Sequence, residues 1–195
     1  MSARPRILFV RHGETDWNVE GRLQGQKDIP LNALGRIQAD DVGRRLSKLI
    51  NNPVQSQWIV SPLGRTRETA EIARRALGLE PLTYRTEDQL KEITFGAWEG
   101  FTWAELRKSE PMAEAERMKN KWGYVPPQGE SYEMLTSRIG LWLETVKSEI
   151  VAVSHGGVAR ALMVLAAGLS PQDAPRHEIH QGRVLEFAEG RFRWH

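Results

Sequence analysis

The chain has 195 residues, of which 40% are hydrophobic and 27% charged, with a formal net charge of +2. These values fit one soluble globular domain spanning residues 1–195 with a full core. The small net charge and the scattered lysines and arginines argue against nucleic-acid binding. The absence of cysteine excludes disulfides and thiolate chemistry, and no apolar run approaches the roughly 20 residues of a membrane span. The N-terminal residues lack the apolar core of a secretory signal, so we expect a cytoplasmic protein.

Apolar runs along the chain predict buried strands. They lie at residues 7–10, 58–60 and 150–153, and a further short strand is expected at 81–86. Near the end of the chain, Val184 to Phe187 and Arg191 to Trp194 alternate around Glu189-Gly190, which predicts a terminal hairpin. A loop rich in glycine and polar residues follows the first strand, from Gly13 to Pro30.

Segments with helical spacing of apolar residues separate these strands. Asn32 is predicted to cap a helix that runs to about Ile50, and Gly78 is predicted to close the next helix. Further helical segments are expected at 102–122 with a break at Pro111, at 135–146, and from 158 to about Gly168. Alternating strands and helices predict an α/β fold of three layers, α/β/α, with a mainly parallel central sheet.

Three of the predicted strands run directly into basic residues. The sequences that follow them are Arg11-His12-Gly13, Ser61-Pro62-Leu63-Gly64-Arg65 and Ser154-His155-Gly156-Gly157. Taken singly, a histidine after a strand is more often structural than catalytic. Ligands of open α/β sheets bind outside the carboxyl ends of the strands, however, so three such junctions predict one convergent basic pocket and an anionic substrate. Glycine after His12 is expected to let the backbone turn sharply.

Four motifs carry a resemblance to a known family. They are RHGET at 11–15, SPLGRTRETA at 61–70, LKEITFGAWEG at 90–100 and VSHGG at 153–157. In this order they resemble the histidine phosphatase superfamily, the phosphoglycerate mutase-like proteins, over nearly the whole chain. Shorter matches are Trp17-Asn18, Leu23-Gln24-Gly25, Asp28 with Pro30-Leu31, and Gly129-Glu130-Ser131.

The resemblance implies that His12 is the nucleophile and forms a phosphohistidine, with its tautomer held by the carbonyl of Gly13. A neutral imidazole is a good nucleophile near neutral pH, and a covalent intermediate divides one hard displacement into two easier ones. Arg11 and Arg65 would bind the phosphoryl oxygens, because the planar guanidinium pairs with phosphate through two hydrogen bonds. His155 would donate a further hydrogen bond and is expected to be most useful when charged.

Glu92 matches the family's general acid and base, which protonates the leaving oxygen and then activates water. Nearby arginines favour the ionised carboxylate, whereas an arriving phosphate dianion opposes it. The alternative interpretation of Glu92 is an exposed loop carboxylate. Phosphate-binding contacts are also expected from Asn18, Gln24, Gly25 and Gly156.

The sequence also carries expectations about ligands. Trp17, Trp98 and Trp122 are candidates to line a pocket for an organic leaving group. We expect no metal and no cofactor, because the ligand pattern of zinc is absent and an arginine-lined pocket disfavours a dication. The expected partner is a small phosphorylated metabolite, with no nucleic acid and no membrane. An exposed edge strand could pair two subunits, so a homodimer stays open.

Three functions compete on this basis. The favoured one is a metal-independent phosphomonoesterase, a histidine-type acid phosphatase. The second is a cofactor-dependent phosphoglycerate mutase. The short segment between Glu92 and Gly129 disfavours it, because mutases of the family resemble one another in a longer basic insertion there. The third is a non-catalytic module that binds a phosphorylated ligand, which would not need His12 and Glu92 together.

Overall fold

The computed structural model describes residues 4–195 and contains one six-stranded sheet with the strand order β3-β2-β4-β1-β5-β6. The strands are β1 (Ile7–Arg11), β2 (Gln57–Val60), β3 (Arg85–Thr86), β4 (Ile150–Ser154), β5 (Val184–Ala188) and β6 (Arg191–Trp194). Strands β1 to β4 are parallel to one another, whereas β5 is antiparallel to its neighbours β1 and β6. The predicted, mainly parallel sheet is therefore confirmed.

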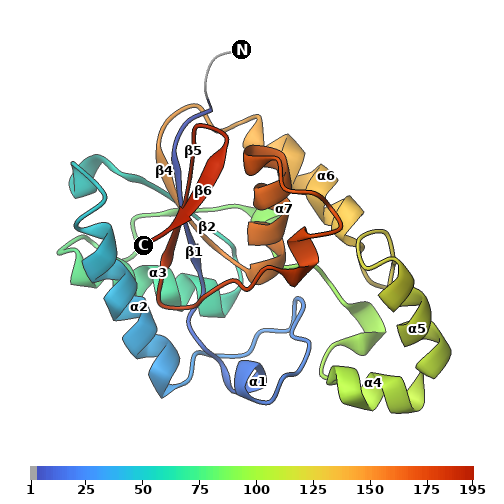
Figure 1. Ribbon diagram of the computed structural model, residues 1–195. Coiled ribbons are helices and arrows are strands. Elements are labelled where there is room, and N and C mark those ends of the chain that lie inside the picture. The colour runs from blue at the N-terminus through green and yellow to red at the C-terminus, as the bar shows by residue number, and fades with distance from the viewer. Residues whose placement is uncertain (1–3) are drawn as a thin grey trace.

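Helices cover both faces of the sheet, which confirms the predicted three layers. The helices are α1 (Asp16–Val19), α2 (Ala33–Leu46), α3 (Gly64–Ala76), α4 (Trp103–Ser109), α5 (Pro111–Lys119), α6 (Tyr132–Leu143) and α7 (Gly156–Ala167). Figure 1 shows α2 and α3 on one side of the sheet and α6 and α7 on the other. Side chains of β1 alternate between these layers: Leu8 and Val10 join the core with α2 and α3, and Ile7 and Phe9 join the core with α6 and α7. Burial of both faces explains the continuous apolar runs of the strands.

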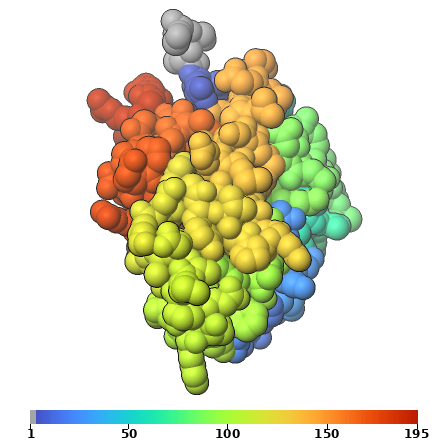
Figure 2. All heavy atoms as spheres, turned by 90° about the vertical axis from the view of Figure 1, so that its right-hand side faces the viewer, coloured from blue at the N-terminus to red at the C-terminus, as the bar shows by residue number. Residues whose placement is uncertain are grey.

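The segment with α4 and α5 extends beyond the sheet. Its own small core contains Leu23, Trp98 and Leu106, with Tyr124 stacked on Trp98 at 5.5 Å between ring centroids. In Figure 2 this yellow-green segment covers the lower part of the face, below α6. The contact with Leu23 ties the segment to the long loop after β1.

Local signals in the sequence set most element boundaries. The Asn32 side chain accepts a hydrogen bond from the Gly35 nitrogen at 2.8 Å and so caps α2. Gly78, with a φ of +71°, follows the C-cap residue Leu77 of α3, and Pro111 begins α5 after a break. The strand expected at 81–86 is only Arg85–Thr86, and α2 ends at Leu46 rather than near Ile50. Short 3₁₀ turns occupy Pro53–Gln55, Asp88–Leu90, Gly96–Trp98 and Ala174–Arg176. Within residues 4–195, no helix combines the length and the apolarity needed to cross a bilayer.

Candidate active site

The site lies where β1 and β4 end side by side. The chain leaves β1 towards α2 on one face and leaves β4 towards α7 on the opposite face, so the two connections diverge and leave a crevice. Arg11 and Ser154 are register partners, and the His12 nitrogen donates to the Ser154 carbonyl at 3.0 Å. This pairing brings the rings of His12 and His155 to 5.3 Å between centroids. The predicted convergence of the strand ends is thus observed in the structure.

His12 is held as a neutral imidazole. Its Nδ1 lies 2.7 Å from the Gly13 carbonyl oxygen, which only accepts hydrogen bonds, so Nδ1 carries the proton and Nε2 keeps its lone pair. Burial lowers the pKa of His12 well below its ordinary value, and the charges of Arg65 and Arg11 lower it further. The ring therefore offers Nε2 as a nucleophile to the pocket that His12 lines.

Gly13 is required for close packing. Its φ is not positive, so its backbone conformation alone does not require glycine, but a Cβ there would lie 2.2 Å from the Gly35 carbonyl oxygen. The loop after β1 thus packs directly on the first turn of α2. Loss of either glycine would push the His12 backbone away from α2.

His155 is fully buried and neutral. Its Nε2 lies 2.8 Å from the Ser61 hydroxyl oxygen, and its Nδ1 has no hydrogen-bond partner among residues 4–195. Burial is the main cause that lowers the pKa of His155 well below its ordinary value, followed by the charge of Arg65. In the free protein His155 is therefore neutral, and the more useful charged form would have to arise when an anion binds. His155 lies beside His12 but is not one of the side chains that line the pocket.

Two buried arginines supply the positive charge of the pocket. Arg11 donates from Nη1 to the Ile179 carbonyl at 2.7 Å, and burial lowers its pKa to about 10. Arg65 donates to the carbonyls of Lys27 at 2.6 Å and Gly25 at 2.7 Å, and burial lowers its pKa. The Nε atoms of both arginines have no partner in the part of the chain that the structure describes. Buried donors that lack acceptors are costly, so they mark a place for an anion.

Glu92 faces the same pocket. Its carboxylate accepts hydrogen bonds from the Gly157 nitrogen at 3.0 and 3.2 Å and from its neighbour Ile93 at 2.9 Å. A Cβ on Gly157 would lie 2.3 Å from Oε1 of Glu92, so glycine is needed for this approach. Glu92 is therefore fixed on the pocket wall, unlike the exposed carboxylate of the alternative interpretation.

The four other residues expected to bind phosphate also line the pocket, which measures about 150 Å³. The Asn18 oxygen accepts from the Thr15 nitrogen at 3.1 Å and from Gln181 at 3.0 Å, which leaves the Asn18 amide N–H groups for a ligand. Gly156 opens α7, where helix N–H groups favour anions. Gly25 has a φ of +50°, and Gln24 is buried with an unpartnered Oε1 among residues 4–195.

Several pocket residues carry no signal in the sequence, and the three candidate tryptophans lie away from the pocket wall. Trp98 is fully buried, and Trp122 stacks on Tyr132 at 5.2 Å. Neither lines the pocket, and nor does Trp17; the apolar wall is formed instead by Leu23, Ile93, Phe95 and Tyr132. Arg160 was also missed, although it lies four residues after Gly156 on α7, a spacing that places both on one helix face.

A larger cavity of about 530 Å³ adjoins the pocket, and we call it the annex. It shares four wall residues with the pocket and is completed by α4 and α5; the shared residues are Leu23, Phe95, Tyr132 and Arg160. Arg107 there pairs with Glu114 at 3.6 Å, whereas the Arg117 guanidinium lies over the Trp103 ring at 3.8 Å and has no ion pair with a described carboxylate. The annex is therefore both aromatic and positively charged.

Comparisons with known proteins place the chain in a family. The family model of the histidine phosphatase superfamily (branch 1) matches residues 7–195. Phosphoglycerate mutase-like protein 4 of Arabidopsis thaliana is 40% identical over 163 residues, which cover 80% of this chain and 68% of that protein. The probable phosphoglycerate mutase GpmB of Escherichia coli is 34% identical over 169 residues, covering 84% and 75%.

A solved structure is similar in fold. The crystal structure of an Escherichia coli protein assigned as an alpha-ribazole-5'-P phosphatase has a TM-score of 0.81 at 23% identity and covers 98% of this chain and 95% of its own. The family match over almost the whole chain, together with relatives of this identity, shows that the chain belongs to the histidine phosphatase superfamily.

Proposed function

We propose that the protein hydrolyses phosphate monoesters through a phosphohistidine on His12. One observation carries the proposal: the free Nε2 of a neutral, buried imidazole lies in a pocket with two arginines whose Nε donors are unpaired among residues 4–195. Phosphoryl transfer depends mainly on positioning and on stabilising charge on the equatorial oxygens. Arg11, Arg65, Asn18 and the N-terminus of α7 supply groups for this stabilisation.

The reaction proceeds in two displacements. Nε2 of His12 attacks phosphorus, the bond from phosphorus to the ester oxygen breaks, and Glu92 gives its proton to that oxygen. Glu92 then takes a proton from water while the water oxygen attacks phosphorus, the P–N bond breaks, and inorganic phosphate leaves. Over one cycle Glu92 gives up one proton and regains one, so the two displacements balance.

In the proposed reaction His155, which lies behind the pocket wall with its ring centroid 5.3 Å from that of His12, contacts the phosphoryl group only once that group is bonded to His12. When the Ser61 hydroxyl donates to Nε2, the proton of the neutral ring is on Nδ1, the atom without a partner among the described residues. That N–H is the donor available to a phosphoryl oxygen. The incoming dianion also favours a second proton on His155, since an opposite charge nearby stabilises the charged imidazole.

The substrate is a small phosphorylated metabolite, and the reaction needs no metal because the arginines already neutralise the phosphoryl charge. The annex receives the leaving group. Arg117, Lys121 and Arg160 there favour a leaving group that carries a carboxylate or another anion.

Phosphoglycerate mutase is the second candidate. The names of the Arabidopsis and Escherichia coli relatives favour it, and a basic annex suits the carboxylate of a phosphoglycerate. The two functions differ only in the acceptor of the phosphoryl group on His12, which is water in the phosphatase and a sugar acid in the mutase.

Three assays with one preparation separate the candidates. Release of nitrophenol from p-nitrophenyl phosphate in the presence of a chelator supports a metal-independent phosphatase. Conversion of 3-phosphoglycerate to 2-phosphoglycerate with a bisphosphoglycerate primer supports the mutase. Binding of phosphate without either turnover supports the non-catalytic module.

The nucleophile is tested by His12→Ala. We expect the variant to fold, as judged by circular dichroism, and to lose turnover and the alkali-stable phosphoenzyme that rapid quenching detects in the wild type. A variant that hydrolyses p-nitrophenyl phosphate at the native rate would exclude His12 as the nucleophile.

A further inference from the structure

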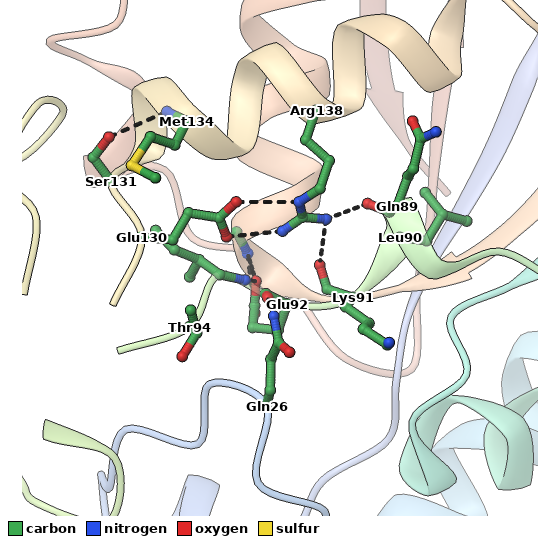
Figure 3. A network of polar contacts seen from close by, with 12 residues as sticks. Gln26, Gln89, Leu90, Lys91, Glu92, Thr94, Glu130, Ser131, Met134 and Arg138 are labelled. Carbon is green, nitrogen blue, oxygen red and sulfur yellow. Dashed lines mark hydrogen bonds and ion pairs between the residues drawn. The ribbon is translucent and has the colours of Figure 1, made fainter. Parts of the chain in front are cut away.

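The loop that carries Glu92 is anchored by its backbone carbonyls (Figure 3). Arg138 on α6 donates to the carbonyls of Gln89 and, at 3.1 Å, of Lys91. Three more carbonyls of the loop accept hydrogen bonds: Leu90 from Ser154 Oγ at 2.7 Å, Glu92 from Gln26 Nε2 at 3.0 Å, and Thr94 from the Glu130 nitrogen at 2.9 Å. Five of the six carbonyls from 89 to 94 therefore accept a hydrogen bond from outside the loop, which is unusual for a loop at the surface of a site.

Arg138 is itself fixed by Glu130. The Glu130 carboxylate accepts from Nε at 3.1 Å and from Nη2 at 2.8 Å, so the ion pair is bidentate. The two side chains are only 23% and 13% exposed, which limits screening by water. Figure 3 shows the guanidinium between this carboxylate and the carbonyls of Gln89 and Lys91. Only a planar guanidinium can serve both sides at once; lysine offers a single charged nitrogen.

Glu130 also joins the loop to the core. Its backbone nitrogen holds Thr94, and the next residue, Ser131, caps α6 by accepting from the Met134 nitrogen at 3.1 Å. Helix α6 is anchored in the main core by Leu135, Ile139 and Trp142, all fully buried. The pair thus connects the two ends of the Glu92 loop to a rigid helix.

We propose that the Glu130–Arg138 ion pair is the positioning device of Glu92, a role that rests on the proposed function and extends it. This role accounts for the Gly129-Glu130-Ser131 motif, whose Glu130 does not line the pocket. Neither side chain is among those that line the pocket, so the pair acts through the loop and not on the substrate. A shift of about 1 Å in a reacting group reduces the rate by a large factor, which makes such anchoring effective.

The choice of leaving group reveals this role. As the bond to phosphorus breaks, the ester oxygen takes the proton of Glu92 while phosphorus bonds to His12. A nitrophenolate ion leaves readily without that proton, whereas a phenolate ion depends on it more strongly. A displaced Glu92 therefore slows phenyl phosphate much more than p-nitrophenyl phosphate, although the two esters fill the pocket in similar ways.

The experiment measures kcat/KM for both esters in Arg138→Met, Arg138→Lys and Glu130→Gln. We expect kcat/KM for phenyl phosphate to fall about tenfold or more in Arg138→Met and that for p-nitrophenyl phosphate to fall less than about threefold. Arg138→Lys should also lower kcat/KM for phenyl phosphate selectively, because one lysine nitrogen cannot hydrogen-bond to both loop carbonyls and to the Glu130 carboxylate. Glu130→Gln keeps the side-chain shape but removes the charge, and the same selective loss is expected for it. It replaces Arg138→Met in the test if that variant does not fold.

The matched control is Arg36→Met, which removes an ion pair to Glu68 at 2.7 Å between α2 and α3, away from the pocket. It should leave the ratio of the two kcat/KM values unchanged. Glu92→Gln is measured alongside and should show the selective loss in full. If Glu92→Gln is selective but the Arg138 and Glu130 variants reduce both esters equally, the positioning role is refuted and the proposed function stands. If Glu92→Gln is not selective, the acid role and the positioning role are refuted together.

Discussion

The Gly157 nitrogen lies 3.0 Å from Oε1 of Glu92, so the first turn of α7 holds a carboxylate that belongs to a loop 65 positions earlier. The same turn follows His155, and its first residue, Gly156, lines the pocket. The first turn of α7 therefore fixes the relative positions of His155, of Gly156 in the anion site and of the Glu92 carboxylate. The absence of a side chain at position 157 is what permits this arrangement.

Gly157→Ala should displace Glu92 and leave the phosphate site in place. Its Cβ would lie 2.3 Å from Oε1 of Glu92, so the carboxylate must move. We expect kcat for phenyl phosphate to fall by about 10²-fold, the lower end of the effect of a general acid. Affinity for inorganic phosphate, measured by calorimetry, should change little.

The control is Gly140→Ala on α6, where the nearest atoms to a new Cβ lie at 4.0 Å on Leu165. This variant should keep full activity and gain up to about 1 kcal/mol of stability, because alanine is the better helix former. Equal losses of activity in both variants would contradict the steric explanation.

Stability should fall on acidification because the two buried histidines stay neutral in the native state. The pKa values of His12 and His155 lie well below those of the unfolded chain, near 6.5. At a pH between the folded and the unfolded pKa values, the unfolded chain binds more protons than the folded chain. The free energy of unfolding therefore decreases as the pH falls below about 6.5. Each imidazole contributes at most about 1.4 kcal/mol per pH unit.

Urea unfolding from pH 7.5 to 5 measures this dependence. His12→Asn should flatten the slope by up to one proton equivalent, and the double variant with His155→Asn by up to two. An unchanged slope in the double variant would show that the two rings titrate alike in the folded and unfolded chain.

The annex should discriminate between leaving groups by charge. Phenyl phosphate and 4-carboxyphenyl phosphate differ by one carboxylate, and Arg117 lies in the annex without an ion pair to a described acid. We expect the wild type to prefer the carboxylated ester in kcat/KM and Arg117→Gln to reduce that preference by about tenfold, as for one hydrogen bond to a charged group. The matched control is Arg75→Gln in the last turn of α3, which should leave the preference unchanged. If the preference for the carboxylated ester is the same in Arg117→Gln as in the wild type, Arg117 does not determine specificity.

Much of the fold could be read from the sequence because its signals are local. Caps such as Asn32, the break at Pro111 and the apolar runs of β1 and β4 depend on neighbours in the chain. The strand at 81–86 was overestimated, since β3 pairs only with β2 at the sheet edge and little burial supports it. An edge strand is decided by its single neighbour rather than by its own composition.

The sequence by itself determined that basic groups follow three buried strands, and the motif order determined the family. Only the tertiary structure decided the states of those groups. His155 is neutral because packing buries it beside Arg65, the tryptophans lie in packing positions rather than on the pocket wall, and Arg138 reaches the Glu92 loop from a helix 47 positions away in the chain. Burial, charge proximity and contacts between distant segments arise only when the layers pack, so no local pattern could have revealed them.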